Sequence, residues 1–163
     1  MSSRTNPRYA DSTAGSVFEF ELPSREFVLD RTLSRFESVT VEPARTAAYG
    51  GEHTWPSIWI HGTERIEAGS LLIDDPDIAA CSPVLDTDDE RLYRIRWSEQ
   101  ARDRINAVCS EEATLQAASA SDGRWTLCVS VPEREQLARL YERYKEHGFA
   151  PCITQIRGQN EMV

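Results

Sequence analysis

Two short segments with the same alternation of apolar and charged residues constrain this chain more than any other feature. Residues 17–22 and residues 92–97 each carry apolar side chains at every second position, the period of a β-strand buried on one face. The charged side chains between them are acidic in the first segment and basic in the second, namely Glu19, Glu21, Arg94 and Arg96. The sequence therefore predicts two similar strands whose polar faces carry opposite charge.

The same order of helix and strand patterns follows each of these segments. After the first, the patterns predict a helix over 24–37, strands over 39–42 and 56–61, a helix over 63–72 and a strand over 78–85. After the second, they predict a helix over 98–108, strands over 113–118 and 124–131, a helix over 132–147 and a strand over 149–157. Each half thus has the order β-α-β-β-α-β, which is typical of ferredoxin-like domains.

We therefore predict an α+β fold, built as a tandem ferredoxin-like (βαββαβ) pseudo-repeat with antiparallel sheets. The predicted units are residues 16–90 and residues 91–157, with a flexible leader over 1–15 and the start of a linker over 158–163. Sequence identity between the halves is slight, so an α+β chain without a duplication is the alternative.

The charged rows give the most specific prediction of an interface. In a ferredoxin-like sheet the first strand is central and the helices cover only one face. Glu19 and Glu21 would then lie on the open face of the first half, and Arg94 and Arg96 on that of the second. We expect the two sheets to associate through these rows, within the chain or between chains. In the alternative interpretation all four side chains are solvated, since exposed ion pairs contribute only about 0–1 kcal/mol each.

The overall charge argues against a nucleic-acid partner for the chain as a whole. The 163 residues include 18 basic and 27 acidic side chains, a formal net charge of -9, which opposes binding to a phosphate backbone. Residues 1–90 carry 7 basic and 17 acidic side chains, whereas residues 91–163 carry 11 and 10. No apolar run approaches the ~18 residues of a membrane span, so we expect a cytoplasmic protein with no membrane partner.

No arrangement of reactive side chains in the sequence indicates catalysis. The cysteines form no C-x-x-C pair and the histidines lack metal-ligand spacing. These residues are Cys81, Cys109, Cys128, Cys152, His53, His61 and His147. Asp74, Asp75 and Asp77 could suggest a divalent metal, but Asp-Asp-Pro is better explained as a helix stop followed by a turn. We therefore predict no catalytic residue, no metal and no cofactor.

Two tryptophans and a histidine form the candidate ligand site. Trp55 and Trp59 lie at the start and in the middle of the strand predicted over 56–61, and His61 ends it. Large aromatic side chains are mostly core residues, but these could instead line a pocket beside the loop over 49–54.

Several short motifs in a fixed order carry a likeness to a known family. They are Phe-Glu-Phe-Glu-Leu-Pro at 18–23, Phe-Val-Leu at 27–29, Leu-Leu-Ile-Asp-Asp-Pro at 71–76, Leu-Tyr-Arg-Ile-Arg-Trp at 92–97, Ala-Thr-Leu at 113–115 and Arg-Trp-Thr-Leu at 124–127. Over about residues 17–157 the chain resembles the N-terminal domain of the bacterio-opsin-activator family of haloarchaeal transcription regulators. One lysine among 18 basic residues and the acidic bias agree with such a source.

The resemblance implies a regulatory role without catalytic residues. In that family the domain precedes a C-terminal helix-turn-helix, sometimes with PAS or GAF sensor domains upstream, and none of these is expected within residues 1–163. The resemblance thus implies a sensory or assembly domain that self-associates and reaches DNA only through a helix-turn-helix outside this chain. The alternative is a small-molecule-binding module like the tandem amino-acid-sensing domains, although the glycine-rich turn those domains use after the first strand is absent here.

Overall fold

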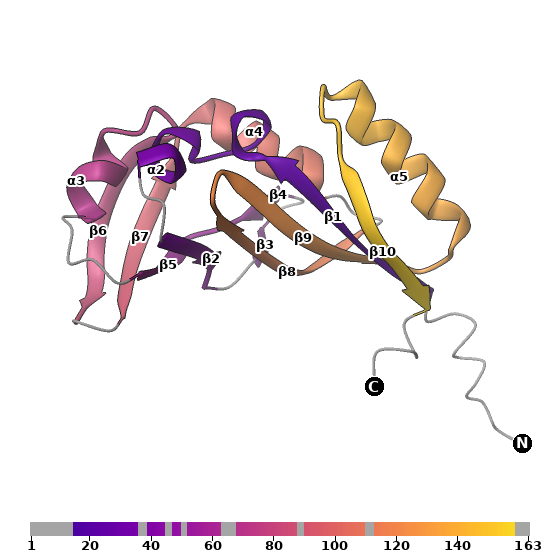
Figure 1. Ribbon diagram of the computed structural model, residues 1–163, viewed down its shortest axis with the longest axis horizontal. Coiled ribbons are helices and arrows are strands. Elements are labelled where there is room, and N and C mark those ends of the chain that lie inside the picture. The colour runs from indigo at the N-terminus through magenta and orange to yellow at the C-terminus, as the bar shows by residue number, and fades with distance from the viewer. Residues whose placement is uncertain are drawn as a thin grey trace, which may run out of the picture.

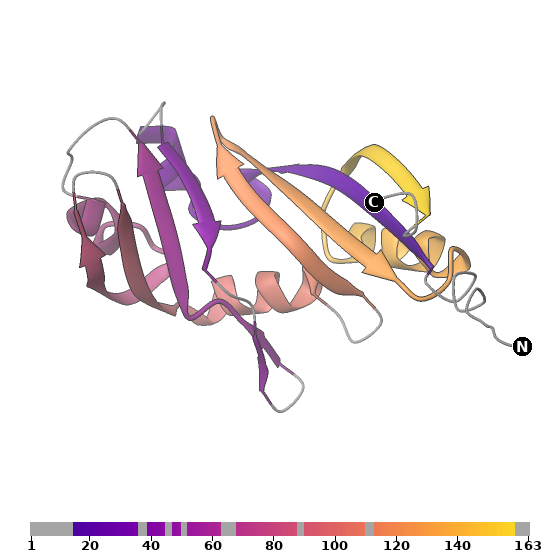
Figure 2. The same ribbon diagram turned by 90° about the horizontal axis from the view of Figure 1, so that it is seen from below.

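The protein has an α+β fold with a single eight-stranded antiparallel sheet, helices covering one of its faces (Figure 1). The computed structural model describes residues 15–35, 39–44, 47–49, 52–62, 68–87, 90–109 and 113–158. Figure 2 views the molecule from the side opposite the helices, so that the strands lie in front. This second face, which no described helix covers, is called the open face below.

The strands of the sheet follow the order β10-β1-β9-β8-β2-β5-β7-β6. Their bounds are Ser16–Pro23 (β1), Val39–Pro43 (β2), Ser57–Gly62 (β5), Ile78–Asp86 (β6), Arg91–Trp97 (β7), Thr114–Ser121 (β8), Arg124–Val131 (β9) and Cys152–Gly158 (β10). Two further strands, β3 (Ala47–Tyr49) and β4 (Glu52–Thr54), form a separate hairpin where the sequence predicted only a loop. The Gly50-Gly51 pair between them is a typical hairpin-turn sequence, so the signal was present.

The helices are short, and two of them agree closely with their sequence patterns. They are the 3₁₀ helix η1 (Ser24–Glu26), α2 (Asp30–Arg35), α3 (Ala68–Ile73), α4 (Glu99–Val108) and α5 (Glu135–Glu146). Ser98 caps α4, its side chain accepting a hydrogen bond from the backbone N–H of Ala101 at 3.2 Å. The predicted inner stripes are buried at Ile105 of α4 and at Leu140 and Tyr144 of α5. The period-3.6 pattern was therefore a reliable guide for both helices.

The first predicted helix is wrong at its start. Ser24 begins only a turn of 3₁₀ helix, and Leu29 then adopts a left-handed φ of 64° before α2 begins at Asp30. The sequence prediction of a helix from Ser24 to Glu37 missed this break because Leu29 carries no local turn signal. Phe36 and Glu37, which that prediction included, lie outside the described residues.

The prediction of two ferredoxin-like sheets, one in each half, is replaced by one continuous sheet in which the first strands are exchanged. β1, from the first half of the chain, lies between β9 and β10 of the second half. β7, from the second half, lies between β5 and β6 of the first. Alternation with a period of two determines which face of a strand is buried, but not which strands are its neighbours. The two strands have the same alternation, so the pattern alone does not indicate which position each strand occupies.

The two parts of the sheet meet at β2 and β8, which are joined by a single register pair, Val41 and Ala120. The first part of the sheet consists of β2, β5, β7 and β6, and the second of β8, β9, β1 and β10. Counting outward from this junction, β7 and β1 are each the third strand. The exchanged strands therefore occupy matching positions on the two sides of the sheet.

An aromatic cluster beneath the helices joins the two halves of the chain. The Trp55 ring lies 5.4 Å from that of Trp125 and 6.3 Å from that of Trp97, measured between centroids. The Phe27 ring packs edge-on against Trp55 at 5.7 Å and Trp125 at 5.3 Å. All four side chains are buried, and aromatic pairs of this kind add to the stabilisation that area burial supplies.

Because each part of the sheet needs a strand from the other half, neither half of the chain should fold alone. We expect residues 16–90 expressed without the remainder to show no cooperative unfolding transition, since β5 and β6 would lose β7, the central strand between them. Mixing this fragment with residues 91–158 should restore the transition, measured by circular dichroism against the intact chain. Cooperative unfolding of the isolated 16–90 fragment would contradict the exchange.

Candidate functional site

The open face of the first part of the sheet gathers most of the side chains that the sequence singled out. Trp59 and His61 come from β5, and Arg94 and Arg96 from the neighbouring β7. The buried residues of these strands, such as Ile60 and Ile95, point to the helix side, so the alternate positions point to the open face. The structure thus places predicted ligand and interface residues on one surface.

Trp59 and His61 form a flat aromatic pair on this surface. Their ring centroids are 6.1 Å apart with an interplanar angle of 14°. His61 Nε2 lies 3.6 Å from an Oε2 oxygen of Glu42 on β2, and both side chains are partly exposed. In the register of the sheet, Trp59 lies between Glu42 and Leu92.

Arg94 and Arg96 are exposed, and neither has an ion-pair partner within the described parts of the chain. The register neighbours of Arg94 are Ser57 and Ser82, and Arg96 lies beside Ala80. Small neutral neighbours leave both guanidinium groups available to an outside carboxylate or phosphate.

Glu19 and Glu21 lie on the open face of the second part of the sheet and are engaged locally. A Glu21 Oε1 oxygen lies 3.4 Å from Nη1 of Arg124, and the Thr154 hydroxyl donates to Oε1 of Glu19 at 2.8 Å. Four strands separate β1 from β7 in the sheet. The acidic and basic rows therefore share one face of the molecule, without meeting within it.

Trp55, the third predicted ligand residue, lies in the core. Its side chain is fully buried, and its backbone oxygen accepts a hydrogen bond of 2.8 Å from the indole N–H of Trp97. Its own indole nitrogen, Nε1, is buried without a hydrogen-bond partner. The structure therefore separates Trp55 from the surface that Trp59 and His61 form.

The aspartates of the Asp-Asp-Pro-Asp segment cap a helix that is distant in sequence. Asp75 Oδ2 accepts hydrogen bonds from the backbone N–H and the hydroxyl of Thr32, at 3.0 and 2.8 Å. Asp77 Oδ2 accepts one from the backbone N–H of Leu29 at 2.7 Å. These bonds satisfy donors at the start of α2, where carboxylates also interact favourably with the helix dipole. The segment does more than the predicted helix stop, because it fixes α2 against the turn after α3.

Burial governs the ionisation of Asp77. It raises the pKa of the carboxyl, and the N–H of Leu29 opposes that rise. The neighbouring negative charge of Asp75 raises the pKa further, while Arg104, at 3.5 Å, lowers it. Among the described residues, no group of three or more His, Cys, Asp or Glu side chains is arranged to hold a metal ion. The contacts that the structure shows for Asp75 and Asp77 are capping hydrogen bonds to Thr32 and Leu29 and an ion pair with Arg104.

The thiols of three cysteines are shifted away from the reactive thiolate form. Burial raises the pKa of Cys109 to about 12, and it also raises the pKa of Cys81 and Cys128. A nucleophilic cysteine requires a lowered pKa. His147 forms the C-cap of α5, as its position before Gly148 suggested, and the side chain of His53 lies outside the described residues.

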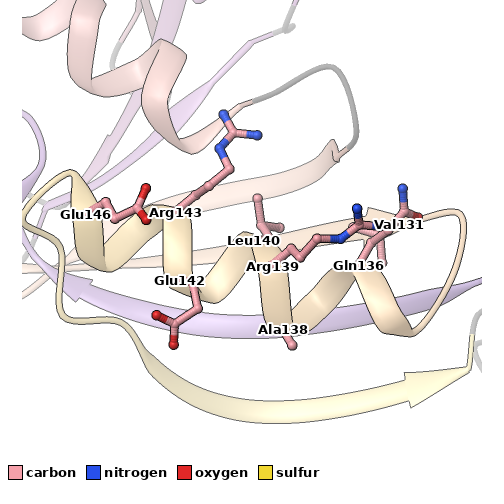
Figure 3. A pocket seen from close by; sticks show the side chains of 8 residues that line it. All are labelled: Val131, Gln136, Ala138, Arg139, Leu140, Glu142, Arg143 and Glu146. Atoms are coloured by element: carbon pink, nitrogen blue, oxygen red, sulfur yellow. The ribbon is translucent and has the colours of Figure 1, made fainter.

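Among the described residues, two cavities that the sequence did not predict lie away from this surface. One of about 380 Å³ follows α5 and is lined by Val131, Gln136, Ala138, Arg139, Leu140, Glu142, Arg143 and Glu146. Figure 3 shows Arg143 projecting from one side of α5 and Glu142 from the other. A second cavity of about 400 Å³ lies beside η1 and α2, next to the turn at Asp122 and Gly123. Trp59 and His61 line neither of them.

The fold and this surface define an α+β module that presents charge and an aromatic pair on an exposed sheet. The chain belongs to the BAT family, described as the GAF and HTH_10 associated domain, and the match covers residues 17–149. BAT is the bacterio-opsin activator N-terminal domain, a regulatory domain and not a known catalytic family, so the resemblance seen in the sequence is confirmed. A search of curated proteins finds no match to this chain. None of the described helices combines the length and apolar character needed to span a membrane.

The two neighbouring aspartates Asp74 and Asp75 offer a matched test of the capping contacts. We expect Asp75→Ala to lower the free energy of unfolding by about 3 kcal/mol, because it leaves the buried donors of Thr32 and Asp77 unsatisfied. Asp74→Ala removes only an exposed ion pair with Arg35 and should cost about 0–1 kcal/mol. Urea denaturation followed by tryptophan fluorescence measures both values, and equal losses would contradict the capping role.

Proposed function

We propose that this chain is a non-catalytic sensory or assembly module of an archaeal transcription regulator, whose DNA-binding helix-turn-helix lies outside the chain. The single observation that carries the proposal is the family match over residues 17–149, since the family is named for its association with GAF and helix-turn-helix modules. The net charge of -9 agrees with a module that does not itself bind the phosphate backbone.

A haloarchaeal source forms part of this proposal. One lysine stands against seventeen arginines, and acidic residues outnumber basic ones by 27 to 18. An acidic surface keeps a protein hydrated and soluble when salt screens most charge interactions. The same bias would keep the module soluble in a cytoplasm rich in salt.

We also infer that the sheet derives from a duplicated β-α-β-β-α-β unit whose first strands were exchanged. In a ferredoxin-like sheet the first strand lies between the third and fourth strands. Here β1 lies between the third and fourth strands of the second half, and β7 between those of the first half. Exchange of the first strands alone turns the expected order of each half into the observed one.

The proposed regulatory role can be tested in cells with the natural full-length protein. Deletion of its gene should change a reproducible set of transcripts, and the tagged protein should enrich promoter DNA in chromatin immunoprecipitation. Complementation with Arg94→Gln/Arg96→Gln should fail to restore the transcripts, because these two exposed arginines lie on the open face without an ion-pair partner among the described residues and are available to a partner. The control Arg102→Gln, on the helix side, should restore them. Unchanged transcripts together with no promoter enrichment would exclude a transcription regulator.

The cavity along α5 favours the second candidate function, a small-molecule-binding regulatory module. Its volume of about 380 Å³ falls within the range of ligand pockets, and its lining combines apolar Val131 and Leu140 with two arginines and two glutamates. Paired charges of both signs suit a zwitterionic ligand such as an amino acid. This use does not require the Trp59–His61 surface.

Ligand binding at this cavity can be tested by thermal shift. A ligand at about 100 times its Kd stabilises the folded state by ~2.7 kcal/mol, so amino acids at millimolar concentration should raise Tm by several degrees if they bind. Arg139→Ala/Arg143→Ala should abolish that rise, whereas Arg102→Ala on α4 should preserve it. No stabilisation of the unaltered protein by any amino acid or nucleotide would remove this candidate.

A further inference from the structure

We propose that two copies of this chain pack with their open faces together, as a twofold β-sandwich dimer. In this dimer the strand that carries Arg94 and Arg96 in each copy lies opposite the strand that carries Glu19 and Glu21 in the other. The dimer concerns the assembly of the proposed regulatory module, but a monomer could still regulate transcription. The two proposals therefore fail through different experiments.

The charge of the open face supplies the first reason. The basic row on β7 is exposed and, within the described ranges, unpaired, while the acidic row on β1 lies on the same face with four strands between them. Since one sheet contains both rows, they cannot meet within the chain. A second copy is a partner that carries the complementary row on an equivalent surface.

The strand order supplies the second reason, because it fixes a symmetric arrangement. β7 and β1 are each the third strand from the junction of β2 and β8. A twofold axis that lies between two facing sheets and runs parallel to the strands at this junction places β7 of one copy over β1 of the other. The same axis creates the second, identical contact on the other side. An axis running across the strands would instead place β7 over β7, with arginine against arginine, and like charges disfavour that arrangement.

The shapes of the facing strands agree with this axis. It places β5, which carries Trp59 on its open face, over β9 of the other copy. Besides the exposed Arg124, the partly buried open-face residues of β9 are Thr126 and Cys128, both small. A large side chain over small ones allows the sheets to approach to the ~10 Å spacing of packed sheets.

The available area is sufficient for a stable dimer. Eight strands spaced about 4.8 Å apart span roughly 38 Å, and a strand of about six residues spans about 20 Å. The open face thus offers on the order of 750 Å² per copy, close to the ~800 Å² per partner of a standard interface. In Figure 2 the β3–β4 hairpin extends past the ends of the strands, so it leaves this face uncovered.

The test reverses the charges of the basic row or of the acidic row in the full chain, at a salt concentration at which the chain is folded. The unaltered protein should sediment as a dimer in analytical ultracentrifugation. Arg94→Glu/Arg96→Glu and Glu19→Arg/Glu21→Arg should each weaken the dimer at least about 100-fold, because each gives the two facing rows the same sign. An equimolar mixture of the two variants should form a heterodimer, since their faces are again complementary. The control Arg102→Glu/Arg139→Glu has one change on α4 and one on α5. It alters the net charge as much as Arg94→Glu/Arg96→Glu does, and it should remain a dimer.

Three outcomes would overturn the proposal. They are a monomeric unaltered protein at about 1 mM, a dimer that neither reversal weakens, and variants that stay monomeric when mixed. The second would indicate another contact, such as the edge strand β10, where Ile153 and Ile156 are 39% and 44% exposed. Should a reversed variant fail to fold by circular dichroism, Arg94→Gln/Arg96→Gln replaces it. An unchanged dimer affinity in that neutral variant would equally exclude the pairing.

Discussion

The packing of Phe27, Trp55, Trp97 and Trp125 is the contact on which the rest of the structure depends. The first two come from the first half of the chain and the last two from the second. Two indole hydrogen bonds orient the cluster, from Trp97 to the backbone oxygen of Trp55 and from Trp125 to that of Val28. Because Trp97 ends the exchanged strand β7, the cluster also holds that strand in its place among the strands of the first half.

Sequence patterns predicted the elements well and their neighbours poorly. The alternation in β1, β7 and β9 identified the buried faces, and the stripes of α4 and α5 identified their inner sides. Local periodicity carries no information about the partner of a strand, so the exchange could not be predicted. The start of α2 was missed for a similar reason, since its capping carboxylates, Asp75 and Asp77, follow it by more than forty residues.

For the candidate surface too, local patterns indicated the exposed side of each strand, whereas the neighbouring strands depend on long-range pairing. Strand alternation indicated that Arg94 and Arg96 share one face of their strand, but it predicted a sheet of the second half, whereas the structure puts them on the strand next to Trp59 and His61. Trp55 lies just before β5 and turns into the core, a placement that its spacing from Trp59 did not reveal. The cavity along α5 was missed because charged residues at the spacing of Arg139, Glu142, Arg143 and Glu146 are common on solvated helix faces and do not by themselves indicate a cavity.

The exchange also orders events during synthesis. β1 is made first among the strands of the sheet, yet both of its neighbours, β9 and β10, are made last. Its apolar face therefore has no neighbouring strand to join until the ribosome has passed residue 131, the end of β9, and contacts so far apart in sequence form slowly. A nascent chain with such an exposed strand is prone to aggregate. Glu19 and Glu21, the charged residues on the other face of β1, would then help to keep the unpaired strand soluble.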